Sequence, residues 1–241
     1  MTGMDATNEN KGRTGEVFER RGGVRKPKAI DLFCCAGGAS MGIHRAGFEV
    51  TGVDIRPQRN YPFEFIQADA LTVPLDGFDF IWASPPCQRY SHAQNAAKNS
   101  HAHPDLIAPI RERLNTWGGP YIIENVVGAP LLNPVTVCGL ALGLKVKRHR
   151  LFESNVFLLT PPCPSHDQDY YVIFGREVRN RVRMGADPKG TRSGRRNNIK
   201  VGHQAMGIDW MNRAELSEAV PPAYAELLCR QVISTLNKQA A

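Results

Sequence analysis

The sequence lacks any long apolar run. Its longest hydrophobic stretches are broken by charges or prolines well short of the roughly 20 residues that a membrane-spanning helix needs. It also lacks an N-terminal segment in which positive charges precede an apolar stretch, as they do in secretory signals. We therefore expect a protein of the cytoplasm, in a bacterium or in a phage-infected host. With 42% apolar residues among 241, the chain can still bury a sizeable core.

Paired cysteines are missing as well. No C-x-x-C motif occurs, and of the six cysteines only Cys34 and Cys35 are close in sequence, a spacing that rarely forms a disulfide. Cys163 and His166, in PPCPSH, have the side chains of metal ligands, but two ligands without a second pair do not predict a site. The sequence therefore predicts no metal, and reduced thiols for every cysteine except Cys87.

Acidic residues are scarce between positions 176 and 200. Nine basic residues stand there against two acidic ones, so this stretch alone carries the +7 charge of the whole chain. The basic residues are Arg176, Arg179, Arg181, Arg183, Lys189, Arg192, Arg195, Arg196 and Lys200. So concentrated a positive charge favours binding of a polyanion. The alternative interpretation is that the stretch is an ordinary solvated loop.

Apolar segments alternate with helical or loop segments over the first half of the chain. Strands are expected at KAIDLF, EVTGVDI, FEFIQ, FDFIWAS and PYIIENV, and helices at MGIHRAGF and over 104–117, with a last helix over 222–237. This rhythm predicts an α/β fold with a doubly wound, mostly parallel sheet. Residues 155–205 break the rhythm with Pro, Gly, Asn and Arg, and we expect a small separate lobe there.

A loop containing two glycines follows the first predicted strand. DLFCCAGGAS runs from Asp31 to Ser40, and Gly37 and Gly38 let the backbone approach a ligand closely. The G-x-G-x-x-G and G-K-[ST] patterns of phosphate-binding loops are both missing. A nucleoside without phosphates therefore fits this loop better than a nucleotide does.

Acidic residues stand at the next two strand ends. Asp54 closes the second strand about 20 residues after the loop, where a carboxylate commonly accepts hydrogen bonds from ribose hydroxyls. Asp69, in QADAL, is placed to accept from an adenine amino group. Either residue alone could be an ordinary surface carboxylate, but their order and spacing favour an adenosyl ligand.

Reactive side chains follow the fourth and fifth strands. Cys87, in SPPCQ, is stiffened by two prolines at a strand exit, and a positioned thiolate is a strong nucleophile. Glu124 ends the next strand, where partial burial would raise its pKa toward use as a general acid. Arg148 and Arg150 alternate along an extended segment and so point the same way.

In this order the motifs resemble those of the DNA cytosine-5 methyltransferases, from Lys28 to the C-terminus. DLFCCAGGAS is similar to the family's S-adenosylmethionine loop, VDI to its ribose-binding motif and ADAL to its adenine-contacting motif. SPPCQ looks like the nucleophile motif, ENV the glutamate motif, RHR the paired-arginine motif and SEAVPPAYAELL the closing motif. The ordered set is very specific, and the chain looks like a compact, phage-like member with a short target-recognition region.

The resemblance implies a Rossmann-like methyltransferase fold, the cofactor S-adenosyl-L-methionine and a set of site residues. The cofactor-binding residues would be Phe33, Cys34, Ala36, Gly37, Gly38, Asp54, Ile55, Asp69, Ala70 and Pro85. The catalytic residues would be Cys87, Glu124, Arg148 and Arg150. The partner would be double-stranded DNA, without a membrane, and we expect a monomer that serves restriction–modification or phage DNA protection.

The implied reaction begins with a cytosine flipped out of the duplex. The Cys87 thiolate adds to C6 while Glu124 neutralises the charge that develops at N3. C5 then takes the methyl group, a base removes the C5 proton, and Cys87 leaves. Arg148 and Arg150 would hold the pyrimidine carbonyl and the adjacent backbone.

Composition and the rhythm of the predicted elements divide the chain into four parts. Residues 1–26 would be a disordered tail, and 27–154 a catalytic and cofactor-binding domain. Residues 155–205 would be a small basic recognition lobe, and 206–241 would return to the catalytic domain and end in a helix.

Two other hypotheses about the function remain open. One is an RNA cytosine or other pyrimidine C5-modifying enzyme on the same scaffold, and the other is a non-catalytic DNA-binding relative. The sequence also departs from the family pattern at four positions. Cys35 stands where glycine is usual, Val146 where a glutamine precedes the arginines, and Ser217 and Glu218 where Gly-Asn is usual.

Overall fold

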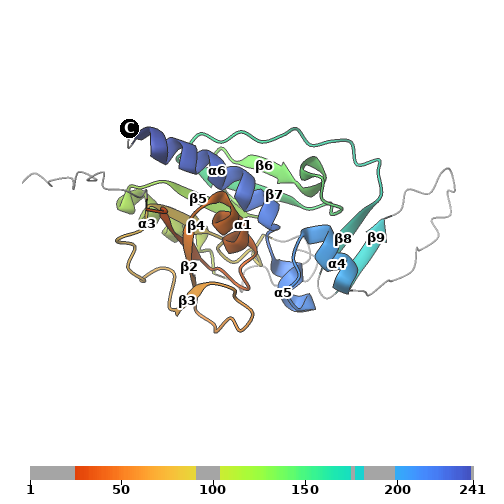
Figure 1. The fold of residues 1–241 in the computed structure, drawn as a ribbon, viewed down its shortest axis with the longest axis horizontal. Helices are drawn as coiled ribbons and strands as arrows, with labels where there is room; N and C mark the ends of the chain where they lie inside the picture. Colours follow the sequence, from red (N-terminus) through yellow and green to blue (C-terminus); the bar gives the residue numbers. More distant parts are fainter. Residues whose placement is uncertain (1–24, 91–103, 175–176, 182–198, 240–241) are drawn as a thin grey trace, which may run out of the picture.

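The structure, a computed structural model, describes residues 25–90, 104–174, 177–181 and 199–239. Figure 1 shows the order of its elements. The strands are β1 Lys28–Leu32, β2 Glu49–Asp54, β3 Glu64–Gln67, β4 Phe80–Ala83, β5 Tyr121–Asn125, β6 Val135–Cys138, β7 His149–Ser154, β8 Tyr170–Phe174 and β9 Glu177–Arg181. The helices are α1 Gly38–Ala46, α3 Ile107–Trp117, the 3₁₀ turn η2 Gly139–Leu142, α4 Ile199–Met206, α5 Arg213–Glu218 and α6 Pro222–Gln239.

The central sheet has seven strands in the order β3-β2-β1-β4-β5-β7-β6. The five strands from β3 to β5 pair in parallel, and β7 pairs antiparallel with both β5 and β6. The prediction of a doubly wound, mostly parallel sheet is thus confirmed. The parallel strands all end at one edge, so the segments after β1, β2, β4 and β5 come together there.

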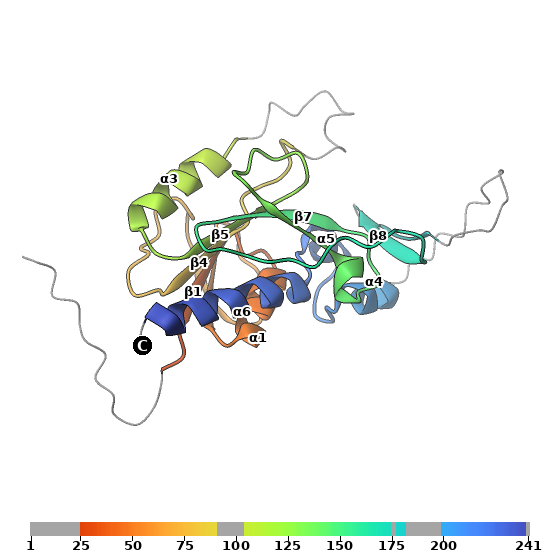
Figure 2. The ribbon, with the colours of Figure 1, turned by 90° about the horizontal axis from the view of Figure 1, so that it is seen from above.

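Helices cover both faces of the sheet. Figure 2 shows α1 and α6 on one face and α3 on the other. On the first face Ile43 of α1 and Leu228 of α6 belong to one buried cluster, and on the second Ile110 and Leu114 of α3 belong to another. Gly42 allows the close approach of α1 and α6, because a Cβ there would collide with the carbonyl oxygen of Pro222.

Pro109 lies in the first turn of α3. It occupies the third position of the helix, after Ile107 and before Ile110. The backbone N–H groups of the first helical turn have no partner within the helix, so a proline there costs no hydrogen bond.

A smaller unit contains a second sheet, in which β8 pairs antiparallel with β9. Residues of β8, α4 and α5 form a third apolar cluster around Met206 and Leu216, and Val146, which belongs to this cluster, forms an isolated bridge with Tyr171. Leu158, inside the predicted lobe, packs instead in the main core with α6. The predicted domain boundaries stay predictions.

The basic stretch from Arg176 to Lys200 falls almost wholly outside the described side chains. Its contact with a polyanion stays a prediction. Within the described ranges, no helix is both long enough and apolar enough to cross a membrane.

Candidate active site

A cleft lies at the carboxyl ends of the parallel strands. It collects side chains from the loop after β1, from SPPCQ after β4, from the end of β5, from β7 and from the segment around α5. Eight of the residues predicted from sequence line it: Phe33, Cys34, Ala36, Gly38, Pro85, Cys87, Glu124 and Arg150. Six do not: Gly37, Asp54, Ile55, Asp69, Ala70 and Arg148.

The loop after β1 turns sharply through left-handed backbone. Phe33, Cys35 and Gly37 have φ angles of 63°, 46° and 81°. Cys35 therefore adopts the conformation for which glycine is the usual residue, at some conformational cost. The replacement of glycine by cysteine changes the side chain on the cleft wall and leaves the turn in place.

Asp54 holds this loop from the neighbouring strand. The carboxylate is almost fully buried, and its two oxygens accept hydrogen bonds from the backbone N–H groups of Cys35 and Arg56, at 3.1 and 2.9 Å. Each carboxylate oxygen has a second lone pair, so a ribose contact is compatible with these bonds. The structure thus gives Asp54 a role in shaping the loop, and its ligand contact stays a prediction.

Three further predicted cofactor residues stand next to Asp54 or on the following strand. Ile55 exposes 66% of its surface at the end of β2, an unusual position for a large apolar side chain. Asp69 is exposed after β3, where its carboxylate accepts from the N–H of Leu71 at 2.9 Å, while Ala70 is buried. None of the three lines the cleft, and their ligand roles stay predictions.

Asp31 is a cleft residue that the sequence analysis did not assign. It is fully buried on β1, and its Oδ2 accepts a hydrogen bond from the Ser40 hydroxyl. Its Oδ1 has no partner among the described residues. The pKa of Asp31 is raised to about 7, chiefly by burial; the hydrogen bond from Ser40 opposes this rise, and the nearby charges of Asp54 and Glu124 add to it. The signal in the sequence was an acidic residue inside an otherwise apolar strand.

Cys87 is held over the cleft by a turn that β5 secures. The buried side chain of Asn125 donates to the carbonyl of Pro85 at 2.9 Å, two residues before the thiol. Burial and the charge of Glu124 raise the pKa of Cys87, and Arg150 and Arg148 partly oppose that rise. Asn125, which the sequence analysis noted only as the end of a strand, thus positions the thiol.

Glu124 and Arg150 form an ion pair inside the cleft. Arg150 Nε lies 3.0 Å from Glu124 Oε1, and the carboxyl is 6% exposed. Burial raises the pKa of Glu124, while Arg150, a hydrogen bond from Ser84 and Arg148 act to lower it. The site therefore combines a thiol, a carboxyl whose protonated form is favoured by burial, and a fixed cation.

Arg148 has a different place from its neighbour. Its guanidinium donates to the carbonyl oxygens of Ile173, at 3.2 Å, and Ser217, at 2.7 Å, and burial lowers its pKa to about 9. The Arg148 side chain thus ties the residue before β7 to β8 and α5. To contact a bound pyrimidine ring, its guanidinium would have to break its hydrogen bonds to these two carbonyl oxygens. Glu218, one of the departures from the family pattern, lines the cleft.

Comparison with known proteins agrees with this geometry. Residues 27–130 match the sequence model of the family described as C-5 cytosine-specific DNA methylase. A search of curated protein sequences found no match. Among solved structures, the fold is similar to that of a DNA modification methyltransferase encoded within an Escherichia coli prophage (15% identity, TM-score 0.55, 88% of this chain and 99% of the other).

Two eukaryotic structures share the fold at a comparable level. They are the Entamoeba histolytica methyltransferase EhMeth (11% identity, TM-score 0.56, 88% of this chain and 99% of the other) and the S. pombe Dnmt2 methyltransferase (13% identity, TM-score 0.54, 89% and 99%). At such identities the likeness concerns the fold alone.

Proposed function

We propose that this chain methylates C5 of a flipped cytosine in double-stranded DNA, with Cys87 as the covalent nucleophile, because residues 27–130 match the sequence model described as C-5 cytosine-specific DNA methylase. The observation that supports this most directly is the cleft itself. It brings Cys87, Glu124 and Arg150 from three separate elements to one place, at the strand ends where this fold class binds ligands.

The family's methyl donor is S-adenosyl-L-methionine, and the described residues fit it. This ligand carries a sulfonium and an amino group, both positive. The Asp31 carboxylate offers one buried oxygen without a protein partner, as a cationic ligand requires. The left-handed loop from Phe33 to Gly37 brings backbone close to the same cleft. When bound, S-adenosyl-L-methionine would supply the methyl group.

The side chains of the cleft account for the remaining chemistry. The Cys87 sulfur forms a bond to C6 of the cytosine, and Glu124 donates a proton or hydrogen bond at N3, which keeps charge from building up on the ring. Arg150 fixes the carboxyl in place through their 3.0 Å contact. Loss of the C5 proton and of the sulfur then restores the ring.

The lobe around the basic stretch would contact the DNA. Nine basic residues against two acidic ones supply a charge suited to phosphates, and some arginines would reach guanine edges in the major groove. We infer that the target sequence is set there.

The proposal is tested by bisulfite sequencing of DNA from cells that do or do not express the full chain. We expect protected cytosines in a fixed sequence context only in the expressing cells. Protection is also expected to disappear when the Cys87→Ser variant is expressed at the same level. Complete conversion in both cultures, with the protein present and folded, would contradict DNA cytosine methylation by this chain.

Asp31 is expected to carry part of the cofactor affinity. A charge-assisted hydrogen bond between the unpaired Asp31 oxygen and the ligand would be worth about 1–3 kcal/mol. Asp31→Asn should therefore weaken S-adenosyl-L-methionine binding roughly five- to hundred-fold. Because the pKa of Asp31 is about 7, the carboxyl is charged only above that pH. Wild-type affinity should therefore rise from pH about 6 to about 7.5, and the variant should lack that rise.

Isothermal titration calorimetry at several pH values measures both effects. Asp76→Asn is the matched control, since it removes an exposed carboxylate from the turn before β4 that does not line the cleft. It should bind like the wild type. An Asp31→Asn variant with wild-type affinity and an unchanged pH profile would show that the unpaired oxygen does not face the ligand.

A further inference from the structure

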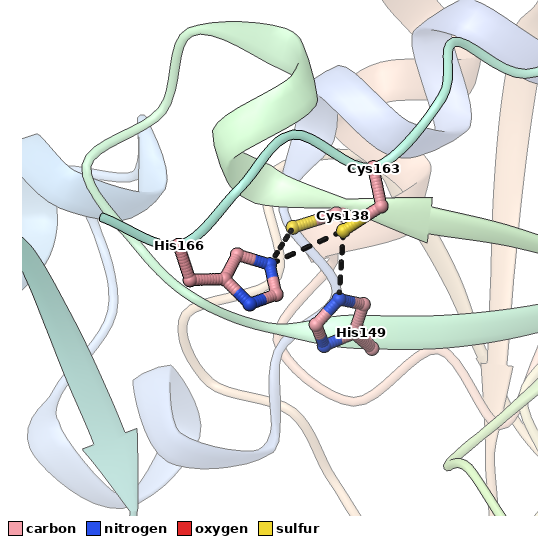
Figure 3. A group of neighbouring side chains, drawn as sticks. All are labelled: Cys138, His149, Cys163 and His166. Atoms are coloured by element: carbon pink, nitrogen blue, oxygen red, sulfur yellow. Dashed lines mark hydrogen bonds between the residues drawn. The ribbon is translucent and has the colours of Figure 1, made fainter. Parts of the chain in front are cut away.

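Four potential metal ligands that the methylation chemistry does not use converge at the end of β6. They are Cys138, His149, Cys163 and His166, and their ligand atoms all lie within 4.8 Å of one another (Figure 3). Three of them are at least partly covered and Cys163 is exposed. In the sequence only Cys163 and His166 stand close together, and that pair alone does not predict a metal site.

The distances between these atoms are those of a tetrahedral metal site. Cys163 Sγ lies 3.1 Å from His166 Nε2 and 3.2 Å from His149 Nε2, and Cys138 Sγ lies 3.6 Å from His166 Nε2. Zinc binds sulfur at about 2.3 Å and nitrogen at about 2.0–2.1 Å, so sulfur and nitrogen ligands of one ion stand about 3.5 Å apart. The observed spacings lie close to that value.

The fold assembles the two halves of the cluster by different means. Cys138 and His149 are direct partners in the antiparallel β6–β7 pair, so their side chains stand on the same face of the sheet. Cys163 and His166 are separated by two residues in the segment that follows β7. This segment, from residue 155 to 169, has no helix or strand of its own, which is uncommon for so long a connection in a compact domain.

We propose that these four side chains bind one structural Zn²⁺ ion. Two sulfur and two nitrogen ligands in tetrahedral array are typical of zinc. Four protein ligands leave no open position, so the ion would hold structure and take no part in the reaction. On binding, each thiol releases one proton, and the two thiolates balance the charge of the ion.

The place of the site indicates what the ion stabilises. His149 stands between Arg148 and Arg150 on an extended strand, so its side chain points to the face opposite theirs. The ion would fix the back of this strand while Arg150 pairs with Glu124 on the front. It would also fasten the middle of the 155–169 segment to the sheet edge, just before β8 begins the recognition lobe.

The test uses the full chain, untagged and purified under reducing conditions without chelator. We expect one zinc per chain by elemental analysis, retained on dialysis. Replacement by Co²⁺ should give thiolate charge-transfer absorption and the intense d–d bands of a tetrahedral site. Cys163→Ser and His166→Ala should lose the zinc on the same dialysis. Because both residues lie on an irregular segment, these variants should keep the fold, which circular dichroism checks.

Two controls separate this site from any other. His44→Ala removes an exposed histidine of α1, and Cys87→Ser removes the thiol of the cleft, so both should keep one zinc. A metal-free wild type that also gives no tetrahedral cobalt spectrum would overturn the proposal. So would zinc retained equally by Cys163→Ser and His166→Ala, or a Cys138–Cys163 disulfide in the reduced preparation.

Discussion

Replacing Cys87 by serine is expected to abolish methyl transfer, by more than about 10³-fold, as in other enzymes that lose their covalent nucleophile. Serine has nearly the same shape, but its hydroxyl is a far weaker nucleophile than a thiolate. Binding of S-adenosyl-L-methionine should not change, because Asp31 and the loop after β1 remain intact. Transfer of labelled methyl groups to duplex DNA, with calorimetry of cofactor binding, measures the two effects.

A duplex containing 5-fluorocytosine tests the identity of the nucleophile independently. Fluorine at C5 cannot leave as a proton does, so the wild-type enzyme should remain covalently attached to the DNA, with the adduct on the Cys87 peptide. Cys229→Ala is the matched control: this buried thiol of α6 packs on one face of the sheet, away from the cleft, and the variant should trap normally. Trapping by the Cys87→Ser variant would mean that another residue is the nucleophile.

The second large effect is expected from Glu124→Gln. The amide keeps a similar shape and can donate a hydrogen bond, but it cannot transfer a proton. Methyl transfer should fall by about 10²–10⁴-fold, the usual contribution of a general acid. The pKa of Cys87 should fall at the same time, because the carboxylate that raises it is gone while the charge of Arg150 remains.

Alkylation with iodoacetamide separates these two effects. At a pH below the wild-type pKa of Cys87, a lower pKa gives a larger thiolate fraction, so the Cys87 peptide should be modified faster in Glu124→Gln than in the wild type. Glu226→Gln, which removes a partly exposed carboxyl of α6 that pairs with Arg230, should change neither rate. If methyl transfer and Cys87 alkylation both fall in Glu124→Gln, the carboxyl acts by shaping the cleft, and its role as acid is refuted.

Much of the fold could be predicted because its signals are local. Apolar segments such as FIWA and YIIE can be recognised as buried strands in isolation, and their alternation with helices fixes a parallel sheet. The residues that end these strands, including Cys87 and Glu124, then fall at one edge by geometry alone. This is why eight of the predicted site residues share a cleft.

The residues that sequence reasoning missed depend on contacts between distant segments. Asn125 matters because its amide reaches the carbonyl of Pro85, which only the pairing of β4 with β5 permits. The contacts of Arg148, a residue that the sequence did predict, depend in the same way on carbonyl oxygens 25 and 69 residues further along the chain. Cys138 and His149 meet through strand register. None of these contacts leaves a periodic pattern in the sequence.

The packing of α1 against α6 also bears on how the chain is made. α1 ends at Ala46, and the helix that covers it begins at Pro222, so more than 170 residues leave the ribosome before that face can be covered. Until then Ile43 and the strands beneath it present apolar surface to water, the condition in which nascent chains associate with chaperones or with one another. The loop that starts the cleft is thus synthesised long before the helix that covers α1.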